Sequence, residues 1–77
     1  MKEFIDFIVK QMVDNPDNVS VEETTPDEHT IEINLKVDKN DIGKVIGKKG
    51  RNVNAMRTLL TAVGAKEHHR ATLQILE

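Results

Sequence analysis

The central stretch of the chain is Ile42-Gly43-Lys44-Val45-Ile46-Gly47-Lys48-Lys49-Gly50-Arg51-Asn52-Val53, a short apolar run, a glycine-flanked turn and the start of an amphipathic segment. The glycines have no Cβ atom, so the backbone of the turn Gly47–Gly50 is free to approach another molecule closely. Its two lysines and the N-terminus of a helix beginning at Arg51 favour an anion there. We therefore expect this turn to bind phosphate.

Other glycine-rich phosphate motifs fit this stretch badly. Three residues separate Gly43 from Gly47, whereas a P-loop needs four before its second glycine, and no Ser or Thr follows Lys48 to hold magnesium. The dinucleotide-binding pattern G-x-G-x-x-G is also absent. A phosphate backbone is the natural candidate for the anion.

Residues 45–53 resemble the signature of K-homology (KH) domains, I-G-x-x-G-x-x-I, with Val53 in the closing aliphatic position. KH domains hold about four nucleotides of single-stranded nucleic acid against their G-x-x-G loop. The resemblance therefore implies a single-stranded RNA-binding protein.

Length and composition indicate one small domain spanning residues 1–77. The resemblance to KH domains implies a β-α-α-β core at about 30–77 and an N-terminal helix–strand extension at 1–29. A chain of this size buries roughly 60–65% of its unfolded surface. It has no cysteine for disulfides or thiolate metal sites. No apolar run approaches the roughly 20 residues of a membrane span, and no signal-peptide pattern is present. We expect a soluble cytoplasmic protein without a membrane partner.

The formal net charge of −2 conceals two regions of opposite sign. From Lys36 to Arg57, seven Lys and Arg face two Asp, which gives +5. The rest of the chain has four basic and eleven acidic residues, which gives −7. A basic centre on an acidic body indicates an oriented site for a polyanion, although ordinary solvated surface is the alternative.

The first half of the chain predicts a helix and a hairpin. Apolar residues at helical spacing indicate a helix over 2–14, ended by Asn15-Pro16. Its apolar arc of about 240° exceeds what one sheet contact needs. A dimer partner and deep insertion into a small core are both open explanations. Strands at Asn18–Thr24 and Thr30–Val37, joined by a turn at 25–28, should pair antiparallel.

The second half predicts two helices and a closing strand. Asp38 caps a short helix over 39–45, and a second helix runs from Arg51 to Val63 with Gly64 as its C-terminal stop. A strand follows at Ala71–Leu76. A right-handed crossover makes this strand parallel to the one at Thr30–Val37.

The resulting order is αββααβ, an α+β fold with a three-stranded mixed sheet packed against three helices. It is similar to the type II, prokaryotic KH arrangement, and the resemblance covers essentially the whole chain. In size, the chain looks like the small bacterial single-KH RNA-binding proteins of the KhpA type. That resemblance implies self-association, pairing with another KH-containing protein, or both.

The predicted RNA site combines the turn with an aliphatic shelf for bases, built from some of Ile42, Val45, Ile46 and Val53. Core packing is the alternative for all four, and we slightly favour it for Ile46. An exposed edge of the closing strand would contact base edges. His68, His69 and Arg70 would flank the groove. The predicted RNA-binding residues are Ile42, Gly43, Lys44, Val45, Ile46, Gly47, Lys48, Lys49, Gly50, Arg51, Val53, Asn54 and Arg57.

Other functions are disfavoured. The two aromatic residues, Phe4 and Phe7, lie far in sequence from the turn, so stacking of bases on aromatic side chains is not expected. No nucleophile and base occur at a recognisable spacing, and adjacent histidines alone do not make a metal site. We expect no catalysis, no cofactor and no metal. An RNA chaperone or post-transcriptional regulator is the main hypothesis, and a protein-interaction scaffold acting through dimerisation is the alternative.

Overall fold

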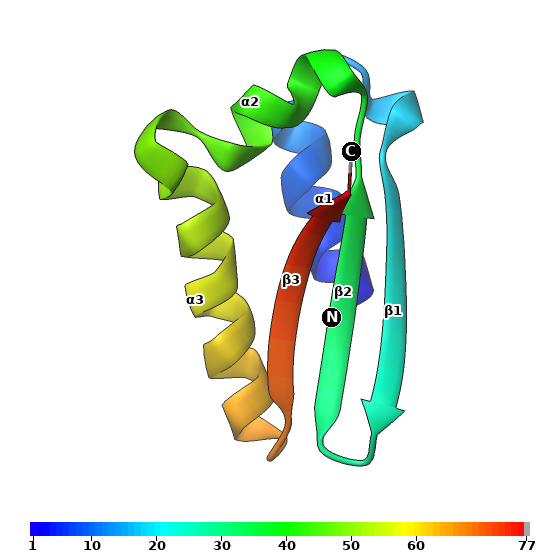
Figure 1. The fold of residues 1–77 in the computed structure, drawn as a ribbon, viewed down its shortest axis with the longest axis vertical. Coiled ribbons are helices and arrows are strands. Elements are labelled where there is room, and N and C mark those ends of the chain that lie inside the picture. The colour runs from blue at the N-terminus through cyan, green and yellow to red at the C-terminus, as the bar shows by residue number, and fades with distance from the viewer. Residues whose placement is uncertain (77) are drawn as a thin grey trace.

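A three-stranded sheet with helices on one face forms the body of the molecule (Figure 1). The computed structural model describes residues 1–76; Glu77, the last residue of the predicted domain, lies outside them. In chain order the elements are α1 (Lys2–Met12), β1 (Ser20–Asp27), β2 (Thr30–Lys36), α2 (Ile42–Ile46), α3 (Arg51–Lys66) and β3 (Arg70–Leu76). Short 3₁₀ segments lie at Pro16–Asn18, Lys39–Asp41 and Lys48–Gly50.

The strand order is β1-β2-β3, with β1 antiparallel and β3 parallel to the central β2. Thr30 is opposite Arg70, and Lys36 is opposite Leu76. The predicted αββααβ order and mixed sheet are therefore confirmed. Because β3 is at one side of the sheet, its outer edge remains open toward α3.

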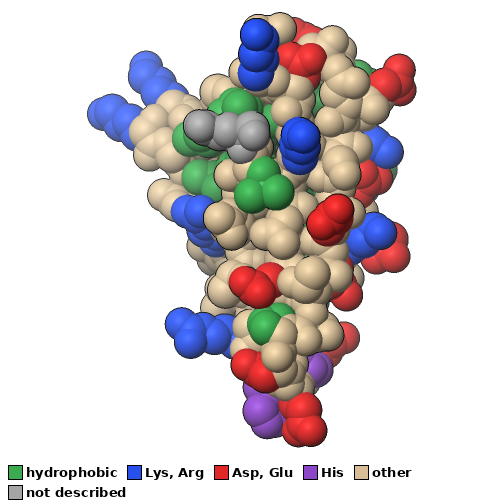
Figure 2. Space-filling view, turned by 45° about the vertical axis from the view of Figure 1, so that its right-hand side comes forward, with side chains coloured by type: hydrophobic (Ala, Val, Ile, Leu, Met, Phe, Trp, Pro, Cys, Tyr) green, Lys and Arg blue, Asp and Glu red, His purple; other side chains and the backbone are tan. Residues whose placement is uncertain are grey.

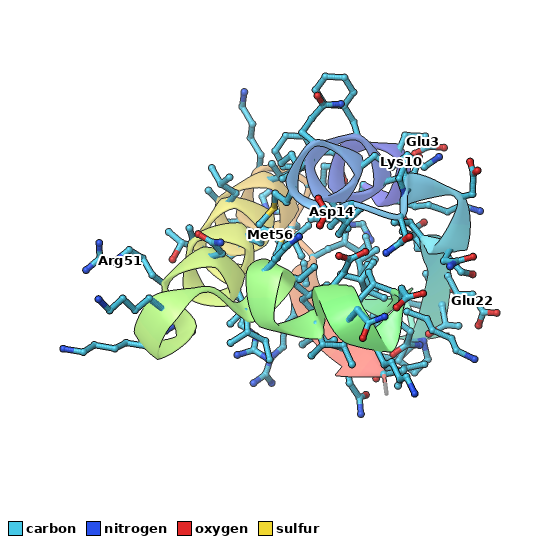
Figure 3. The ribbon with its side chains drawn as sticks, turned by 90° about the horizontal axis from the view of Figure 1, so that it is seen from above. Glu3, Lys10, Asp14, Glu22, Arg51 and Met56 are labelled. Atoms are coloured by element: carbon cyan, nitrogen blue, oxygen red, sulfur yellow. The ribbon has the colours of Figure 1, made fainter. Side chains whose placement is uncertain are left out.

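The core fills the space between the sheet and the helices. Ile31, Ile33 and Leu35 alternate along β2 and are buried, as the period of two predicted. They pack with apolar side chains from the other helices and strands and from the residue after β2: Ile5, Val9, Val21, Val37, Val45, Val53, Met56, Leu60 and Leu73. Met56 points from α3 toward α1 (Figure 3). Full burial of each large aliphatic side chain stabilises the fold by about 1.5–3 kcal/mol.

Helix α1 ends at Met12, two residues earlier than predicted. Val13 is extended, and the backbone N–H groups of Asp14 and Asn15 donate to the carboxylate of Asp41 instead of continuing the helix. The wide apolar arc of α1 is not inserted deeply into the core, since the side chain of Phe7 is 66% exposed.

Strand β1 begins later and ends later than predicted. It covers Ser20–Asp27, and the turn consists of Glu28 and His29. The Asp27 carboxylate accepts hydrogen bonds from the N–H of His29 (2.8 Å) and the hydroxyl of Thr30 (3.1 Å), which fixes the turn after Pro26. Pro26 is tolerated because β1 is an edge strand and its register shifts between Thr24 and Asp27.

Helix α3 continues past Gly64 to Lys66, so the prediction that Gly64 ends the helix is wrong. The helix ends in a Schellman motif: the N–H of His69 donates to the Gly64 carbonyl (2.7 Å) and that of His68 to the Ala65 carbonyl (3.1 Å). His68 takes the left-handed conformation, with φ of 61°. Gly64 is buried, and glycine is needed there because a Cβ atom would lie 2.8 Å from the His69 carbonyl oxygen.

The short helix before the turn is capped as expected, by the Asp38 carboxylate accepting from the N–H of Asn40 (2.9 Å). It is divided into the 3₁₀ segment Lys39–Asp41 and α2. Within residues 1–76, every helix falls short of the length and apolar character that crossing a membrane requires.

Candidate nucleic-acid interface

The G-x-x-G turn, Gly47-Lys48-Lys49-Gly50, connects α2 to α3 at one end of the molecule (Figure 1). Gly47 has φ of 78° and ψ of 170°, a combination that is essentially restricted to glycine. A Cβ atom at Gly47 would also lie 2.7 Å from the side chain of Asn52. Both the backbone conformation and the packing therefore require glycine at this position.

The second half of the turn is left-handed. Lys49 has φ of 59° and Gly50 has φ of 75°. A Cβ atom at Gly50 would meet only the Asn54 side chain, at 3.5 Å, so backbone conformation rather than space favours glycine there. The turn therefore depends on glycine at Gly47 for both space and conformation, and at Gly50 for conformation.

The first turn of α3 has no capping side chain, because its N-cap residue is Gly50. The N–H groups at such a helix start attract an anion through their hydrogen bonds and through the helix dipole. Three exposed basic side chains surround it: Lys48, Lys49 and Arg51. Arg51 projects away from the sheet and the core (Figure 3). The turn therefore combines backbone donors and mobile positive charge.

Asn52 fastens the turn in place, and sequence reasoning missed it. Its side-chain amide donates to the carbonyl oxygen of Lys44 at 2.9 Å, which joins the end of α2 to the beginning of α3. The same side chain packs under Gly47. An asparagine two residues after the second glycine was the available signal, but its partner in α2 is defined only by the turn geometry.

The structure divides the predicted aliphatic shelf into core and surface. Val45 and Val53 are buried, and Ile42 is partly buried against the same core. Ile46 is 37% exposed, so the preference for placing it in the core was wrong. The reason is the short α2, which has only five residues and turns one apolar face, that of Val45, inward. Ile46 and the outer part of Ile42 are therefore the exposed portion of the predicted shelf.

Lys44 is directed away from the predicted site. Its ammonium group forms an ion pair with Asp14 and lies 3.8 Å from the Asp41 carboxylate. The hydrogen bond to Asp14 raises the pKa of Lys44 despite partial desolvation. Asp14 lies between α1 and α2 (Figure 3), so this lysine joins those two helices. Gly43 is beside it in α2, with open space where a Cβ atom would be.

Asp41 is the one buried charged residue among residues 1–76. Burial works to raise the pKa of Asp41, but hydrogen bonds from Asn15 and Asp14 and the charge of Lys44 outweigh it, so the pKa lies below 3.8. The carboxylate therefore stays ionised and connects the end of α1 to the start of α2.

Asn54 and Arg57 follow the turn on the outer side of α3 and are exposed. The Arg57 guanidinium donates to the carbonyl oxygen of Leu73 through Nε at 3.4 Å and Nη2 at 3.3 Å. The Leu73 carbonyl belongs to the open edge of β3, where base edges were expected to bind. Arg57 thus joins α3 to that edge, and His69 and Arg70 line the same seam farther from the turn.

Charge is distributed unevenly over the surface. Lys and Arg side chains dominate the left outline in Figure 2, whereas most Asp and Glu side chains are on the right and at the lower end. The basic side of the molecule is the side of the G-x-x-G turn and α3.

Comparison with known proteins identifies this arrangement. A family model described as KhpA/KhpB, KH domain matches residues 2–75. The chain belongs to the KhpA/KhpB KH-domain family. Proteins named RNA-binding protein KhpA are 47% identical in Chlamydia pneumoniae and 47% identical in Aquifex aeolicus, each over 77 residues that cover 100% of this chain and 97% and 96% of the relatives. The relative of the same name in Clostridium acetobutylicum is 45% identical over 99% of this chain and 100% of its own.

No solved structure matches the chain. Membership of the KH-domain family agrees with the fold: the G-x-x-G turn of this KH domain lies between the two helices of its β-α-α-β core.

Proposed function

We propose that this KH domain, residues 1–77, binds single-stranded RNA without catalysing a reaction and acts in the cytoplasm as an RNA chaperone or post-transcriptional regulator. The observation that carries the proposal is the G-x-x-G turn, with both glycines at positive φ beside an uncapped helix start and three exposed cations. Relatives sharing nearly half of the sequence bear the name RNA-binding protein, which supports it.

In the proposed complex the RNA backbone lies on the G-x-x-G turn. Phosphates meet the N–H groups of the turn and of the first turn of α3, while Lys48, Lys49 and Arg51 add charge without reading sequence. Bases turn toward Ile46, the exposed side of Ile42 and the edge of β3. Val45 and Val53 are buried and support the aliphatic shelf from the core.

Affinity for a short RNA should be modest and dependent on salt. No aromatic residue lies near the turn for stacking, because Phe4 and Phe7 are both on α1. If about three phosphates are contacted, the slope of log K against log salt is roughly −2, and a fourfold increase in salt weakens binding about 15-fold.

The test is RNA binding by the wild type and by Lys48→Asp/Lys49→Asp at two salt concentrations, with thermal melts of both. A matched control is Lys2→Asp/Lys66→Asp, which changes the net charge equally but lies outside the turn. We expect the first variant to lose the salt-sensitive binding at an unchanged Tm, and the control to retain most of it. Equal binding by both double variants would overturn the assignment of the turn.

A second proposal is that the KH domain acts as a protein-interaction scaffold through a second copy of itself. The observation that favours it is an apolar face shared by α1 and α3, with Phe4, Phe7, Leu59 and Val63 all exposed. Ile8 and Met12 of α1 and Ala55 of α3 line a shallow groove of about 300 Å³ within it. Exposed apolar areas of this kind mark interaction surfaces.

A two-fold axis through this apolar face would bring the same patch of two copies together. The charges of α1 do not select this pairing, because Lys10 forms an ion pair with Asp6 of its own helix at 3.1 Å and Glu3 and Lys10 lie on the side of α1 away from α3 (Figure 3). Two RNA sites in one dimer would raise the effective affinity for a long RNA.

Analytical ultracentrifugation of the wild type and of Phe7→Asp tests the scaffold proposal. We expect a dimer for the wild type and a monomer for the variant, with Glu22→Lys on the far side of β1 as the control. If the wild type is a monomer at all concentrations, pairing with a second copy is excluded, and the partner would have to be a different protein, such as another KH-containing chain.

A further inference from the structure

Lys44 bonds to two different helices, one through its side chain and one through its backbone. Its ammonium group pairs with the carboxylate of Asp14, just after the end of α1, and lies 3.8 Å from the carboxylate of Asp41. Its carbonyl oxygen accepts the hydrogen bond from the side-chain amide of Asn52 in α3, at 2.9 Å. One residue of α2 is therefore joined to the exit of α1, thirty positions earlier, and to the start of α3, eight positions later.

Helix α2 needs such contacts to keep its orientation. It has only five residues and one buried side chain, that of Val45. A helix this short is not stable by itself in water, so contacts with the rest of the molecule must hold it. Gly43 adds no packing, because nothing lies within 4 Å of the place where a Cβ atom would be. Since Gly47 follows α2 directly, any movement of α2 is passed on to the first half of the G-x-x-G turn.

The ammonium group of Lys44 is surrounded by carboxylates instead of facing the proposed RNA path. Asp14 lies between α1 and α2, whereas Arg51 projects outward from the start of α3 (Figure 3). One ammonium group and the two carboxylates beside it carry +1 and −2, which gives −1. A cluster of negative net charge does not attract a phosphate. In this respect Lys44 differs from Lys48 and Lys49, which are exposed on the turn itself.

The ion pair of Lys44 with Asp14 is exposed enough to be removed without unfolding the chain. The side chain of Lys44 is 45% exposed and that of Asp14 is 76% exposed. Exposed ion pairs contribute little to the stability of a whole fold. Hydrogen bonds from a turn to a phosphate weaken steeply with distance and angle, so a small shift of α2 matters more for RNA binding than for folding.

We infer that Lys44 is a positioning residue of the RNA site: it touches no RNA, and by joining the exit of α1 to Asn52 of α3 it sets the orientation of the G-x-x-G turn. The inference rests on the proposed RNA-binding function. It replaces the direct RNA contact that the sequence predicted for Lys44, and it makes Asp14, an acidic residue, favourable for the binding of a polyanion.

The sign of the effect at Asp14 is the first test. Removing an acidic side chain strengthens the binding of a polyanion if only the overall charge matters. We expect the opposite for Asp14→Asn: affinity for a labelled single-stranded RNA of mixed sequence should fall about fivefold, the lower end of typical coupling between sites. Asp17→Asn is the matched control, because Asp17 is an exposed acid that makes no ion pair within residues 1–76. It should bind RNA at least as tightly as the wild type.

Variants of Lys44 separate positioning from a direct phosphate contact. Lys44→Met should weaken binding about fivefold and leave the slope of log K against log salt unchanged. In Lys48→Met, which loses a proposed phosphate contact, that slope should become shallower by about 0.7. Lys44→Arg keeps the ion pair and should bind like the wild type. The double variant Asp14→Asn/Lys44→Met should be no weaker than either single variant, because both changes remove the same contact.

A measurement without RNA reports on the same contact. In the wild type the side-chain amide of Asn52 donates to the Lys44 carbonyl, so its protons should exchange slowly with water in NMR spectra. Exchange should become faster in Asp14→Asn and in Lys44→Met as α2 loosens. The side-chain amide of Asn54, an exposed residue of the same helix, is the internal reference and should not change. A general loss of stability would not produce this selective change.

The outcomes distinguish the inference from the function on which it rests. Unchanged or tighter binding by Asp14→Asn, a salt slope for Lys44→Met as shallow as that for Lys48→Met, or unchanged exchange at Asn52 overturns the inference and leaves RNA binding at the G-x-x-G turn intact. Absence of RNA binding by the wild type overturns the proposed function and the inference with it.

Discussion

The Asp41 carboxylate accepts two hydrogen bonds from Asn15 through one oxygen, from the backbone N–H at 3.0 Å and from the side-chain amide at 3.1 Å. Its other oxygen accepts from the N–H of Asp14 at 3.2 Å. The exit of α1 is thereby tied to the start of α2, twenty-six residues later. Since α2 leads directly into the G-x-x-G turn, the orientation of the proposed RNA site depends on this buried carboxylate.

Replacing Asp41 with Asn should destabilise the fold. The NH₂ group of the new amide would face at least one of the N–H groups that now donate to the carboxylate. Two donors cannot pair, so buried polar groups would be left without a hydrogen bond. We expect thermal denaturation to show a Tm lower by roughly 10 °C. Asp17→Asn is the control and should melt like the wild type, because the Asp17 side chain is exposed and makes no hydrogen bond within residues 1–76. An unchanged Tm in Asp41→Asn would show that the tie is dispensable.

Acid should weaken the fold through the same residue. The pKa of Asp41 is below 3.8 in the folded chain, so its contribution is fully present above the unfolded value and is lost as pH falls through the folded pKa. Asp27, whose pKa is lowered mainly by the hydrogen bond from His29, adds to the effect with the same sign. The urea midpoint, measured from pH 6 down to pH 2, should decrease once the pH is below about 4. The decrease should be less steep in Asp41→Asn. Equal slopes for the two proteins would exclude Asp41 as a source.

A methyl group at Gly47 should damage both stability and binding. Alanine would be strained at φ of 78° and ψ of 170°, and its Cβ would overlap Asn52. We expect Gly47→Ala to lose about 1–3 kcal/mol of unfolding free energy in urea. The control for stability is Gly43→Ala, where a Cβ meets nothing within 4 Å in a helical backbone; it should gain up to about 1 kcal/mol. Similar changes in the two variants would contradict the strained turn.

Replacing Gly64 with Ala should change stability in the opposite direction from the same exchange at an ordinary helical glycine. Exchange of an exposed helical Gly for Ala stabilises by about 1 kcal/mol. At Gly64 the added Cβ would be 2.8 Å from the backbone oxygen of His69 and 3.2 Å from the Cβ of Ala71, so we expect a net loss of about 1–3 kcal/mol as β3 is pushed away from α3. A denaturation midpoint above that of the wild type would refute the close approach.

Local signals in the sequence predicted most of the fold. The alternation of Ile31, Ile33 and Leu35 identified β2, and the two glycines around Lys48 and Lys49 placed the break between α2 and α3. These signals depend on neighbours within a few positions, so they survive in a single sequence. The order of elements then left one reasonable way to pair the strands.

What the sequence could not provide depends on distant contacts. Gly64 resembles a helix stop, and only its packing against Ala71 shows why it is glycine. Ile46 and Val45 are equally apolar, and the length of α2 decides which one is exposed. The hydrogen bonds from Asn15 to Asp41 are indicated by no pattern within either segment. The RNA contacts assigned to the site remain predictions.

The parallel pairing of β2 with β3 also bears on how fast the chain folds. Every pair in that ladder joins residues forty positions apart, such as Thr30 with Arg70, whereas the β1–β2 hairpin and α3 need only near neighbours. Closing so long a segment costs chain entropy before any contact between the two strands can stabilise the pairing. The hairpin and α3 should therefore appear first, in microseconds, and wait for β3 to dock. Until it docks, β2 has an unpaired edge, and the unfinished molecule is open to the strands of other chains.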